Sequence, residues 1–562
     1  MSIFFRIVGR ARGLIVAGII MMIFLAANFS VKATDSAPQM RALWVDAFRA
    51  GIKTQDQVDK LIQDAINGNI NTLIVQVRRR GDAYYNKSIE PRTEDPDLTP
   101  GFDALQYLID KAHANGIEVH AWLNTLVAWN RAIPPKDPNH VWNLHGLKAS
   151  DKDTWVSYYR VYDNQTKSWS QKLYSSFYLD PGNPEVVDYT TNVYMNIVKN
   201  YDVDGIHLDY SRYSDREFGY NPTCIARYNA EYKTSGMPAP DDPNWMQWKR
   251  EQTANLMRKI YLNAIALKPK LKVSSAVITW GDGPVSEGDW EKSTAYNRVC
   301  QDWRSWLQEG IIDMAVPMNY YSEWKPEQQN WYNHWIEWEK DHQYGRQIVI
   351  GPGIFMQYIE QSFEQIRRAQ VPSIKGNTVA GVALYAYRAS NLYSSDDYKE
   401  SVASRGFARQ PYRYAPETND WFFHLLSQGG GYTDPVLNQH IDTKPVFPER
   451  TTIPDMPWKS HPVNGYLMGN LPTGSGKAFD HVKIMVDRLF RLPNLPYGIP
   501  DGSFHREIYS DGSGWFGLAE IPPGYYQVTV DSNGDVEKRQ FEVQAGHVFE
   551  ADFGVTTEKV SP

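Results

Sequence analysis

The sequence has no excess of basic residues. Its 58 Lys and Arg are outnumbered by 65 Asp and Glu, which gives a formal net charge of −7 at pH 7. A nucleic-acid partner requires a basic footprint, so none is expected. Hydrophobic residues (42%) and charged residues (22%) are balanced as in an ordinary globular protein. At 562 residues the chain is too long for one core, and two or more domains are expected.

Several catalytic signatures are also missing. There is no HExxH motif or other closely spaced set of His and Asp, so no metal site is expected. No G-x-S-x-G turn or Cys–His pairing indicates a nucleophilic Ser or Cys. The Gly-rich turn that holds the phosphates of a nucleotide is absent as well, and no cofactor is expected.

Cysteine is nearly absent, with only Cys224 and Cys300 in the chain. Both follow predicted strands and fall in adjacent loops on one rim. A disulfide between them is one interpretation, worth ~3–4 kcal/mol in the loop-closure model. Two buried thiols are the other.

The N-terminus has the pattern of a secretory signal. Three Arg precede an apolar run, and small residues at Val31 and Ala33 suit cleavage after residue 33. The alternative is an uncleaved membrane anchor. We expect an exported protein, periplasmic or extracellular. No Cys lies near the processing site, so a lipid anchor is not expected.

From Arg41 onward, short apolar strands alternate with helical stretches, which is typical of repeated βα units on a parallel sheet. Helical periodicity is clear at residues 55–67, 104–115, 185–200, 248–267 and 361–369. The predicted strands are residues 42–48, 72–78, 118–124, 205–210, 272–278, 314–320, 347–351 and 381–387.

Eight βα units indicate a (β/α)8 barrel, which we place at residues 40–439. A doubly wound open sheet is the alternative, but the turn after Phe48 lacks its phosphate-binding glycines. Residues 440–462 are Pro-rich and aperiodic, which indicates a linker. Residues 463–557 alternate short strands with turns, which predicts a small all-β immunoglobulin-like sandwich.

Barrel active sites lie at the C-terminal ends of the strands. In the fourth predicted strand, alternation turns His207 and Asp209 to one face, and Ile206 and Leu208 to the other. Asp209 is therefore expected in the barrel mouth, where a carboxylate suits a glycosidase. A structural salt bridge with Arg212 or Arg78 is the alternative.

Glycoside hydrolysis commonly uses a second carboxyl group. Glu323 in the loop after the sixth strand is the first candidate, and Asp282 after the fifth strand is the second. Solvated loop acids are the alternative for each. Candidate substrate-binding residues share the strand ends or the loops that follow them: Arg78, Asp82, Tyr85, Trp122, Asn124, Trp129, His207, Tyr210, Arg212, Trp280, Tyr320 and Tyr321.

The stretch from Arg41 to about Arg388 resembles glycoside-hydrolase-like family ten. The motifs that carry the resemblance are RALWVDAF, VQVRRRGDAYY, HAWLN, DGIHLDYSRY, DWRSWLQEGIIDMAVPMNYY and GVALYAYR, in the family's order. The resemblance implies a (β/α)8 barrel that hydrolyses O-glycosyl bonds, with cell-wall glycan as the leading substrate and association with the cell envelope. It favours Asp209, Arg78, Asp82, Trp122, Asn124 and Tyr320 as site residues.

The C-terminal part, with WFGLAEIPPGYYQVTV, resembles carboxypeptidase-regulatory-like or Cna-B-like sandwiches. Such modules usually serve as spacers or binding domains. Three functions therefore stay open: a polysaccharide hydrolase that uses Asp209 and a second carboxyl group, a non-catalytic glycan-binding barrel, and an exported structural or adhesion protein.

Overall fold

The structure is a computed structural model. It describes residues 37–146, 149, 153–163, 165, 168–172, 177–395, 413–471, 479–491, 498–532 and 535–553. The predicted signal sequence at residues 1–33 lies outside these ranges. None of the helices in the described ranges combines the length and the hydropathy that a membrane crossing needs.

Eight parallel strands close into a barrel in the described part of the chain, which confirms the predicted fold class. Going round the barrel, the order is β1, β12, β11, β10, β9, β8, β3 and β2, with β2 returning to β1. The strands are β1 (Met40–Val45), β2 (Thr72–Arg78), β3 (Glu118–Asn124), β8 (Gly205–Asp209), β9 (Lys272–Val277), β10 (Met314–Asn319), β11 (Gln347–Pro352) and β12 (Gly381–Tyr385).

Alternation along the strands sorts their side chains into two cores. In β8, Ile206 and Leu208 join the large apolar cluster between strands and helices. Trp44 and Trp122 belong to a smaller cluster inside the barrel. Strand β1 ends three residues before the predicted end, because the Asp46 carboxylate accepts the backbone N–H groups of Phe48 and Arg49 and turns the chain.

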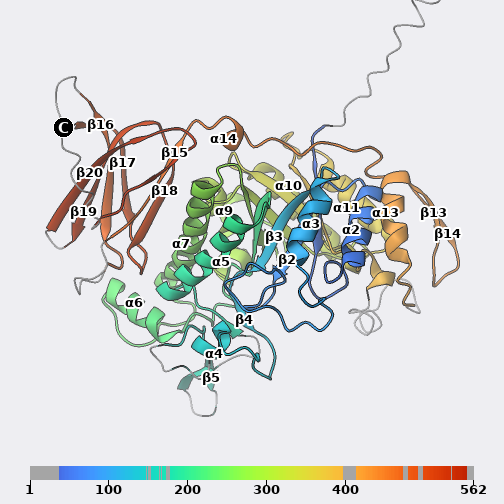
Figure 1. Cartoon of the computed structure of the whole chain (residues 1–562), viewed down its shortest axis with the longest axis horizontal. Coiled ribbons are helices and arrows are strands. Elements are labelled where there is room, and N and C mark those ends of the chain that lie inside the picture. The colour runs from blue at the N-terminus through green and yellow to red at the C-terminus, as the bar shows by residue number, and fades with distance from the viewer. Residues whose placement is uncertain are drawn as a thin grey trace, which may run out of the picture. The chain divides into compact units, whose positions relative to one another are not determined.

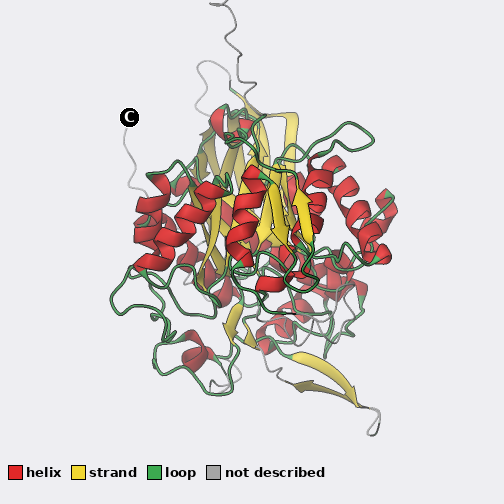
Figure 2. Cartoon of the chain, turned by 90° about the vertical axis from the view of Figure 1, so that its right-hand side faces the viewer, coloured by secondary structure: helices red, strands yellow, loops and turns green. Residues whose placement is uncertain are grey.

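Amphipathic helices surround the strands (Figures 1 and 2). Helix α7 begins five residues before the predicted helix, because the Asp242 carboxylate caps the N–H groups of Asn244 and Trp245. The principal helices are α2 (Gln55–Asn67), α3 (Ala104–His113), α5 (Pro184–Asn200), α7 (Pro243–Leu267), α9 (Trp303–Glu309), α10 (Pro326–Asp341), α11 (Ile359–Gln370) and α13 (Thr418–Gln428).

The two ends of the barrel are covered differently. The end at which the strands finish carries short elements, lower in Figure 1. They are β4 (Val127–Trp129), α4 (Val141–His145), β5 (Tyr159–Asp163), β6 (Ser168–Lys172), β7 (Phe177–Tyr178) and α6 (Pro222–Tyr232).

The opposite end is closed by part of the segment predicted as a linker, residues 440–462. Its first residues form β14 (His440–Thr443), which pairs with β13 (Gly430–Thr433). Further on, α14 (Pro457–Ser460) is anchored to the barrel, because the Trp458 indole donates to Asp313 at 2.7 Å and the Lys459 ammonium pairs with the same carboxylate at 3.0 Å. This part of the segment is packed rather than loose.

Met456 provides a test of that packing. Its side chain is 4% exposed and belongs to the apolar cluster inside the barrel. Met456→Ala is expected to lower the free energy of unfolding by about 2–3 kcal/mol, measured by urea denaturation. Met237 is 40% exposed, and Met237→Ala should change that free energy by less than about 0.5 kcal/mol. If Met456→Ala and Met237→Ala both change the free energy of unfolding by less than about 0.5 kcal/mol, residues 440–462 act only as a linker.

The C-terminal part forms two sheets with their own core. One has the order β18, β15, β21, and the other β17, β16, β19, β20. Leu467, Ile484, Phe516 and Tyr526 lie in the core between them. The strands are β15 (Gly465–Asn470), β16 (Lys483–Phe490), β17 (Ile499–Tyr509), β18 (Trp515–Ile521), β19 (Gly524–Ser532), β20 (Asp535–Val543) and β21 (Val548–Glu550).

The two cysteines do not form the disulfide that the sequence allowed; both are free thiols. Cys224 is buried on α6 among aromatic residues that include Trp248. Cys300 is buried in a different cluster, with its sulfur 3.9 Å from that of Met246. Burial raises the pKa of both thiols. The interpretation as two buried thiols therefore holds.

Candidate active site

A cavity of about 130 Å³ opens at the C-terminal ends of the barrel strands, and we call it the barrel-mouth cavity. It is smaller than the roughly 300–1,000 Å³ of sites for drug-sized ligands, so it suits one ring or substituent of a longer ligand. Its lining is mostly aromatic and polar: Trp44, Phe48, Gln76, Trp122, Asn124, Asp209, Tyr210, Arg212, Ala276, Met318, Tyr320 and Tyr385.

Two larger hollows, of about 530 and 650 Å³, lie elsewhere. They form where barrel helices, among them α7, meet the C-terminal sheets. Neither is lined by a barrel strand. The barrel-mouth cavity is therefore the better candidate, because barrel enzymes work at the ends of their strands.

Asp209 is the last residue of β8 and the only acid among the residues that line this cavity. Its carboxylate accepts the backbone N–H of Tyr210 at 2.7 Å. Tyr210 has a φ of 54°, in the left-handed region that bulky residues rarely adopt. Such backbone conformations cluster at functional sites. The rigid strand and this turn hold the carboxyl group in the barrel mouth.

The environment of Asp209 favours its protonated form. Burial raises the pKa of Asp209, and three neighbours oppose that effect: the Arg212 guanidinium, the Tyr210 N–H and the Trp122 indole. The net shift is upward. A carboxyl group with a raised pKa can act as a proton donor nearer to neutral pH than an exposed aspartic acid.

The rim beside Asp209 is cationic and aromatic. Arg212 is 9% exposed, and its guanidinium carbon lies 4.5 Å from the ring centre of Tyr210 and 5.7 Å from that of Trp280. Trp280, in the loop after β9, is 43% exposed. Across the cavity Tyr320 stacks on Tyr385, with ring centres 5.2 Å apart. Aromatic faces of this kind can stack on sugar rings.

The floor is held by hydrogen bonds between strands. The Gln76 amide donates to the Asn124 carbonyl oxygen at 2.9 Å, so both side chains are fixed. His207 does not line the cavity; it accepts from the Trp44 indole at 3.2 Å and contacts Ser274 at 2.8 Å. Burial lowers the pKa of His207 to about 3, so this imidazole is neutral and supports the floor.

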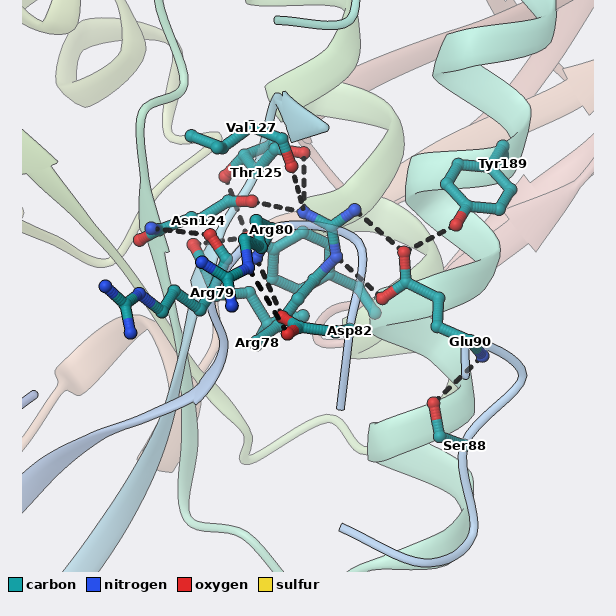
Figure 3. Close-up of polar contacts among 12 residues, drawn as sticks. Arg78, Arg79, Arg80, Asp82, Ser88, Glu90, Asn124, Thr125, Val127 and Tyr189 are labelled. Atoms are coloured by element: carbon teal, nitrogen blue, oxygen red, sulfur yellow. Dashed lines mark hydrogen bonds and ion pairs between the residues drawn. The ribbon is translucent and has the colours of Figure 1, made fainter. Parts of the chain in front are cut away.

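Arg78 was predicted to bind substrate, but its guanidinium is directed elsewhere (Figure 3). It forms two hydrogen bonds with the Glu90 carboxylate, at 2.7 and 2.8 Å, and both side chains are buried. It also donates to the backbone carbonyl of Asn124, and Tyr189 donates to Glu90. Burial lowers the pKa of Arg78, but the Glu90 charge more than offsets this and the net shift is upward.

Other candidates from the second and third strands also support the site from outside the cavity lining. Asp82 accepts from Thr93 at 2.8 Å and lies 3.7 Å from the Arg80 guanidinium. Arg80 in turn lies 4.6 Å from the ring centre of Trp129. Tyr85 is 1% exposed and contacts Tyr201 edge-on at 5.5 Å between ring centres.

Neither candidate for the second carboxyl group lines the cavity. The Glu323 side chain is 8% exposed and forms an ion pair with Arg368 of α11. Asp282 is on the surface and hydrogen-bonds His334 at 2.7 Å. Tyr321 is likewise occupied, since its hydroxyl donates to the backbone carbonyls of Thr279 and Gly281.

Sequence reasoning placed six of the cavity-lining residues among its candidates, and it missed the rest. Trp44 and Tyr385 are cavity residues because the first and last strands are neighbours when the barrel closes. Phe48 was assigned to a strand although it lies in the loop. A search for aromatic residues near the ends of every predicted strand, the first and last included, would have found Phe48 and Tyr385, but not Trp44, which lies inside its strand.

Glu339 is a buried acid near β10, the strand that carries the cavity-lining residue Met318. It is fully buried on α10 and accepts from the Asn319 amide at the end of β10, at 2.9 Å. Its other oxygen has no hydrogen-bond partner among the described residues. Burial raises its pKa well above 4.5. The folded protein therefore keeps the Glu339 proton to a higher pH than an exposed glutamic acid does.

Stability should consequently depend on pH through Glu339. The unfolded chain releases this proton near pH 4.5 while the folded chain keeps it, so wild-type stability falls as pH rises from there toward the folded pKa. The slope is up to about 1.4 kcal/mol per pH unit. Glu339→Gln should lack this slope when urea unfolding is compared from pH 5 to 8. If the difference in unfolding free energy between wild type and Glu339→Gln stays constant with pH, Glu339 does not cause the pH dependence.

The chain is similar in sequence to known proteins. Residues 39–368, more than half of the chain, match the family Glycosyl hydrolase-like 10. Glycosyl hydrolase DigH of Escherichia coli (strain K12) is 29% identical over 283 residues, which cover 49% of this chain and 59% of that protein. Glycosyl hydrolase YngK of Bacillus subtilis (strain 168) is 27% identical over 306 residues, which cover 51% and 55%.

The chain thus spans less than two thirds of the length of these relatives. Among solved structures, the glycoside hydrolase domain of PgaB (BpsB) from Bordetella bronchiseptica gives a TM-score of 0.44 at 13% identity, covering 64% of this chain and 98% of that one. A likeness of this degree does not bear on activity. The match over residues 39–368 decides the family, and the chain belongs to the Glycosyl hydrolase-like 10 family.

Proposed function

We propose that the protein hydrolyses O-glycosyl bonds in a polysaccharide, with Asp209 as the proton donor. The observation that carries the proposal is the buried Asp209 carboxyl group in an aromatic-lined cavity at the barrel mouth. The leaving sugar oxygen must gain a proton as its bond to the anomeric carbon breaks. A carboxyl group whose pKa burial has raised is suited to donate it.

The reaction also needs a nucleophile at the anomeric carbon. Asp209 is the only acid among the residues that line the cavity, which favours a substrate that brings its own nucleophile. A 2-acetamido sugar does so: its carbonyl oxygen bonds to the anomeric carbon while Asp209 protonates the leaving oxygen. Water then opens the cyclic intermediate and returns a proton to Asp209. Cell-wall glycan, which is rich in 2-acetamido sugars, is the proposed substrate.

The test is the release of reducing ends from cell-wall glycan by the purified protein. We expect release from N-acetylated strands, competitive inhibition by a thiazoline analogue of the cyclic intermediate, and at least tenfold slower release from de-N-acetylated strands. Equal rates on N-acetylated and de-N-acetylated strands would exclude the acetamido group as the nucleophile and would indicate a second carboxyl group. No release from any glycan would remove the hydrolase proposal.

A non-catalytic glycan-binding barrel is the second candidate. This candidate is favoured because Asp209 is the only acid among the residues that line the cavity. Glu323 and Asp282 both pair with residues outside the cavity. A binding protein would hold cell-wall oligosaccharides, quench the fluorescence of Trp44 and Trp122, and release no reducing ends in either wild type or an Asp209 variant.

We also propose that the protein is exported to the periplasm or the medium and associates with the cell envelope. The basic and apolar pattern of residues 1–33 supports this. Mass spectrometry of the protein recovered from these compartments should give an N-terminus after Ala33. Recovery of the intact chain from the membrane fraction would instead indicate an anchor.

A further inference from the structure

The barrel mouth contains more arginine than its acids can pair with. Three acids near the ends of β1 and β2 each have an arginine partner among the described residues. The pairs are Asp46 with Arg49, Glu90 with Arg78, and Asp82 with Arg80. Two arginines at the same mouth, Arg79 and Arg212, have no ion pair within 4 Å in the described part of the chain. Each adjoins the cavity.

Arg79 lies at the rim. Its guanidinium carbon is 3.8 Å from the ring centre of Phe48, and Phe48 lines the cavity. The Arg79 backbone carbonyl accepts from Asn124, another lining residue. Figure 3 shows the Arg79 side chain directed away from the Arg78–Glu90 network. A guanidinium with one face on an aromatic ring keeps its in-plane N–H groups for a ligand.

Arg212 lines the cavity itself and is only 9% exposed. Its Nε has no hydrogen-bond partner among the described residues. Asp209 acts on it only through space, since no ion pair joins the two within 4 Å. A buried guanidinium N–H without a partner is costly unless a ligand accepts it.

Charge at the mouth has the sign opposite to that of the whole chain. Asp209 and Arg212 are the only charged residues that line the cavity, and Arg79 adds a second cation at the rim. Once Asp209 is protonated for its role as the acid, the mouth is positive, although the chain carries a net charge of −7. Such a mouth attracts an anionic group and rejects a cationic one.

We propose that the cavity selects a sugar that bears a carboxylate, and that Arg79 and Arg212 are the residues that recognise it. The proposal rests on the hydrolase function above and specifies its substrate class. A planar carboxylate matches the forked N–H groups of arginine. Two sources share this chemistry: the lactyl ether carboxylate of peptide-free cell-wall glycan, and the ring carboxylate of a uronic acid.

Four substrates separate these cases. They are peptide-free cell-wall glycan, the same glycan with its carboxylates converted to amides, a polymer that alternates glucuronate with N-acetylglucosamine, and neutral N-acetylglucosamine oligomers. We expect kcat/KM to be roughly 10- to 100-fold higher on one carboxylate polymer than on its neutral counterpart, the loss expected for a charge-assisted hydrogen bond. The preferred carboxylate polymer identifies the source. Equal kcat/KM on all four overturns the inference and leaves the hydrolase function intact.

Arg79→Gln should reduce the ratio of kcat/KM on the carboxylate and amide substrates to near 1, mainly through KM, and Arg79→Lys should retain part of it. Arg506 is exposed on β17 of the C-terminal sheets, so Arg506→Gln should keep the wild-type ratio. Circular dichroism verifies that each variant is folded. If Arg79→Gln keeps the wild-type ratio of kcat/KM on the carboxylate and amide substrates, Arg79 does not recognise the carboxylate.

If no substrate is cleaved, the hydrolase function fails and the same preference is measured as binding. Quenching of tryptophan fluorescence by the carboxylate and amide glycans then decides the inference. At least tenfold tighter binding of the carboxylate form supports it, and equal binding overturns it.

Discussion

Asp209→Asn is expected to lower kcat on cell-wall glycan by roughly 10²–10⁴-fold, the usual contribution of a general acid. Asparagine has nearly the same shape and accepts the Tyr210 N–H in the same way, but it has no proton to give to the leaving sugar. Binding should stay within about threefold of wild type, measured by fluorescence titration. The loss should therefore appear in kcat and not in KM.

Asp282→Asn is the matched control. Asp282 is an exposed acid on the loop after β9 that does not line the cavity. Its replacement should change kcat by less than about twofold. If Asp282→Asn were inactive while Asp209→Asn kept its activity, the acid would be on the β9 loop and the assignment to β8 would be wrong.

Glu90→Gln is expected to produce the largest loss of stability. The change leaves the buried Arg78 guanidinium without its counter-charge, which costs about 3–5 kcal/mol of unfolding free energy. It also disturbs the hydrogen bond from Tyr189. Urea denaturation measures the effect directly. Since the Arg78 side chain is directed away from the cavity, KM of the protein that remains folded should change little.

The double variant Arg78→Met with Glu90→Leu removes both charges together. It should recover most of the lost stability, because a buried ion pair contributes little relative to well-packed apolar groups. If Glu90→Gln unfolds like wild type and raises KM, Arg78 belongs to the binding site as the sequence suggested.

The barrel was predictable because its signals are local. Eight apolar runs separated by amphipathic stretches fix the strand count, and the alternation in residues 205–209 fixes the face on which Asp209 lies. The strand ends were accurate to within two residues, except in β1, where Asp46 turns the chain and the strand ends three residues early.

The partners of charged residues were not predictable, because they depend on loop paths. Nothing in the sequence indicates that Arg78 pairs with Glu90, 12 positions along, rather than pointing into the cavity. The same applies to Glu323, whose partner Arg368 is 45 positions away. The packing of Met456 was not predicted either. The segment around it is rich in proline, and a single apolar residue does not indicate a buried position.

If Asp209 is the proton donor, its carboxyl group faces the glycosidic bond that is cleaved. A crystal structure of Asp209→Asn with a peptide-free cell-wall tetrasaccharide would show whether it does. We expect a sugar ring in the barrel-mouth cavity and a glycosidic oxygen within roughly 2.6–3.2 Å of the residue 209 side chain, or one water away. A tetrasaccharide bound with no glycosidic oxygen within that reach would show that Asp209 is not the proton donor.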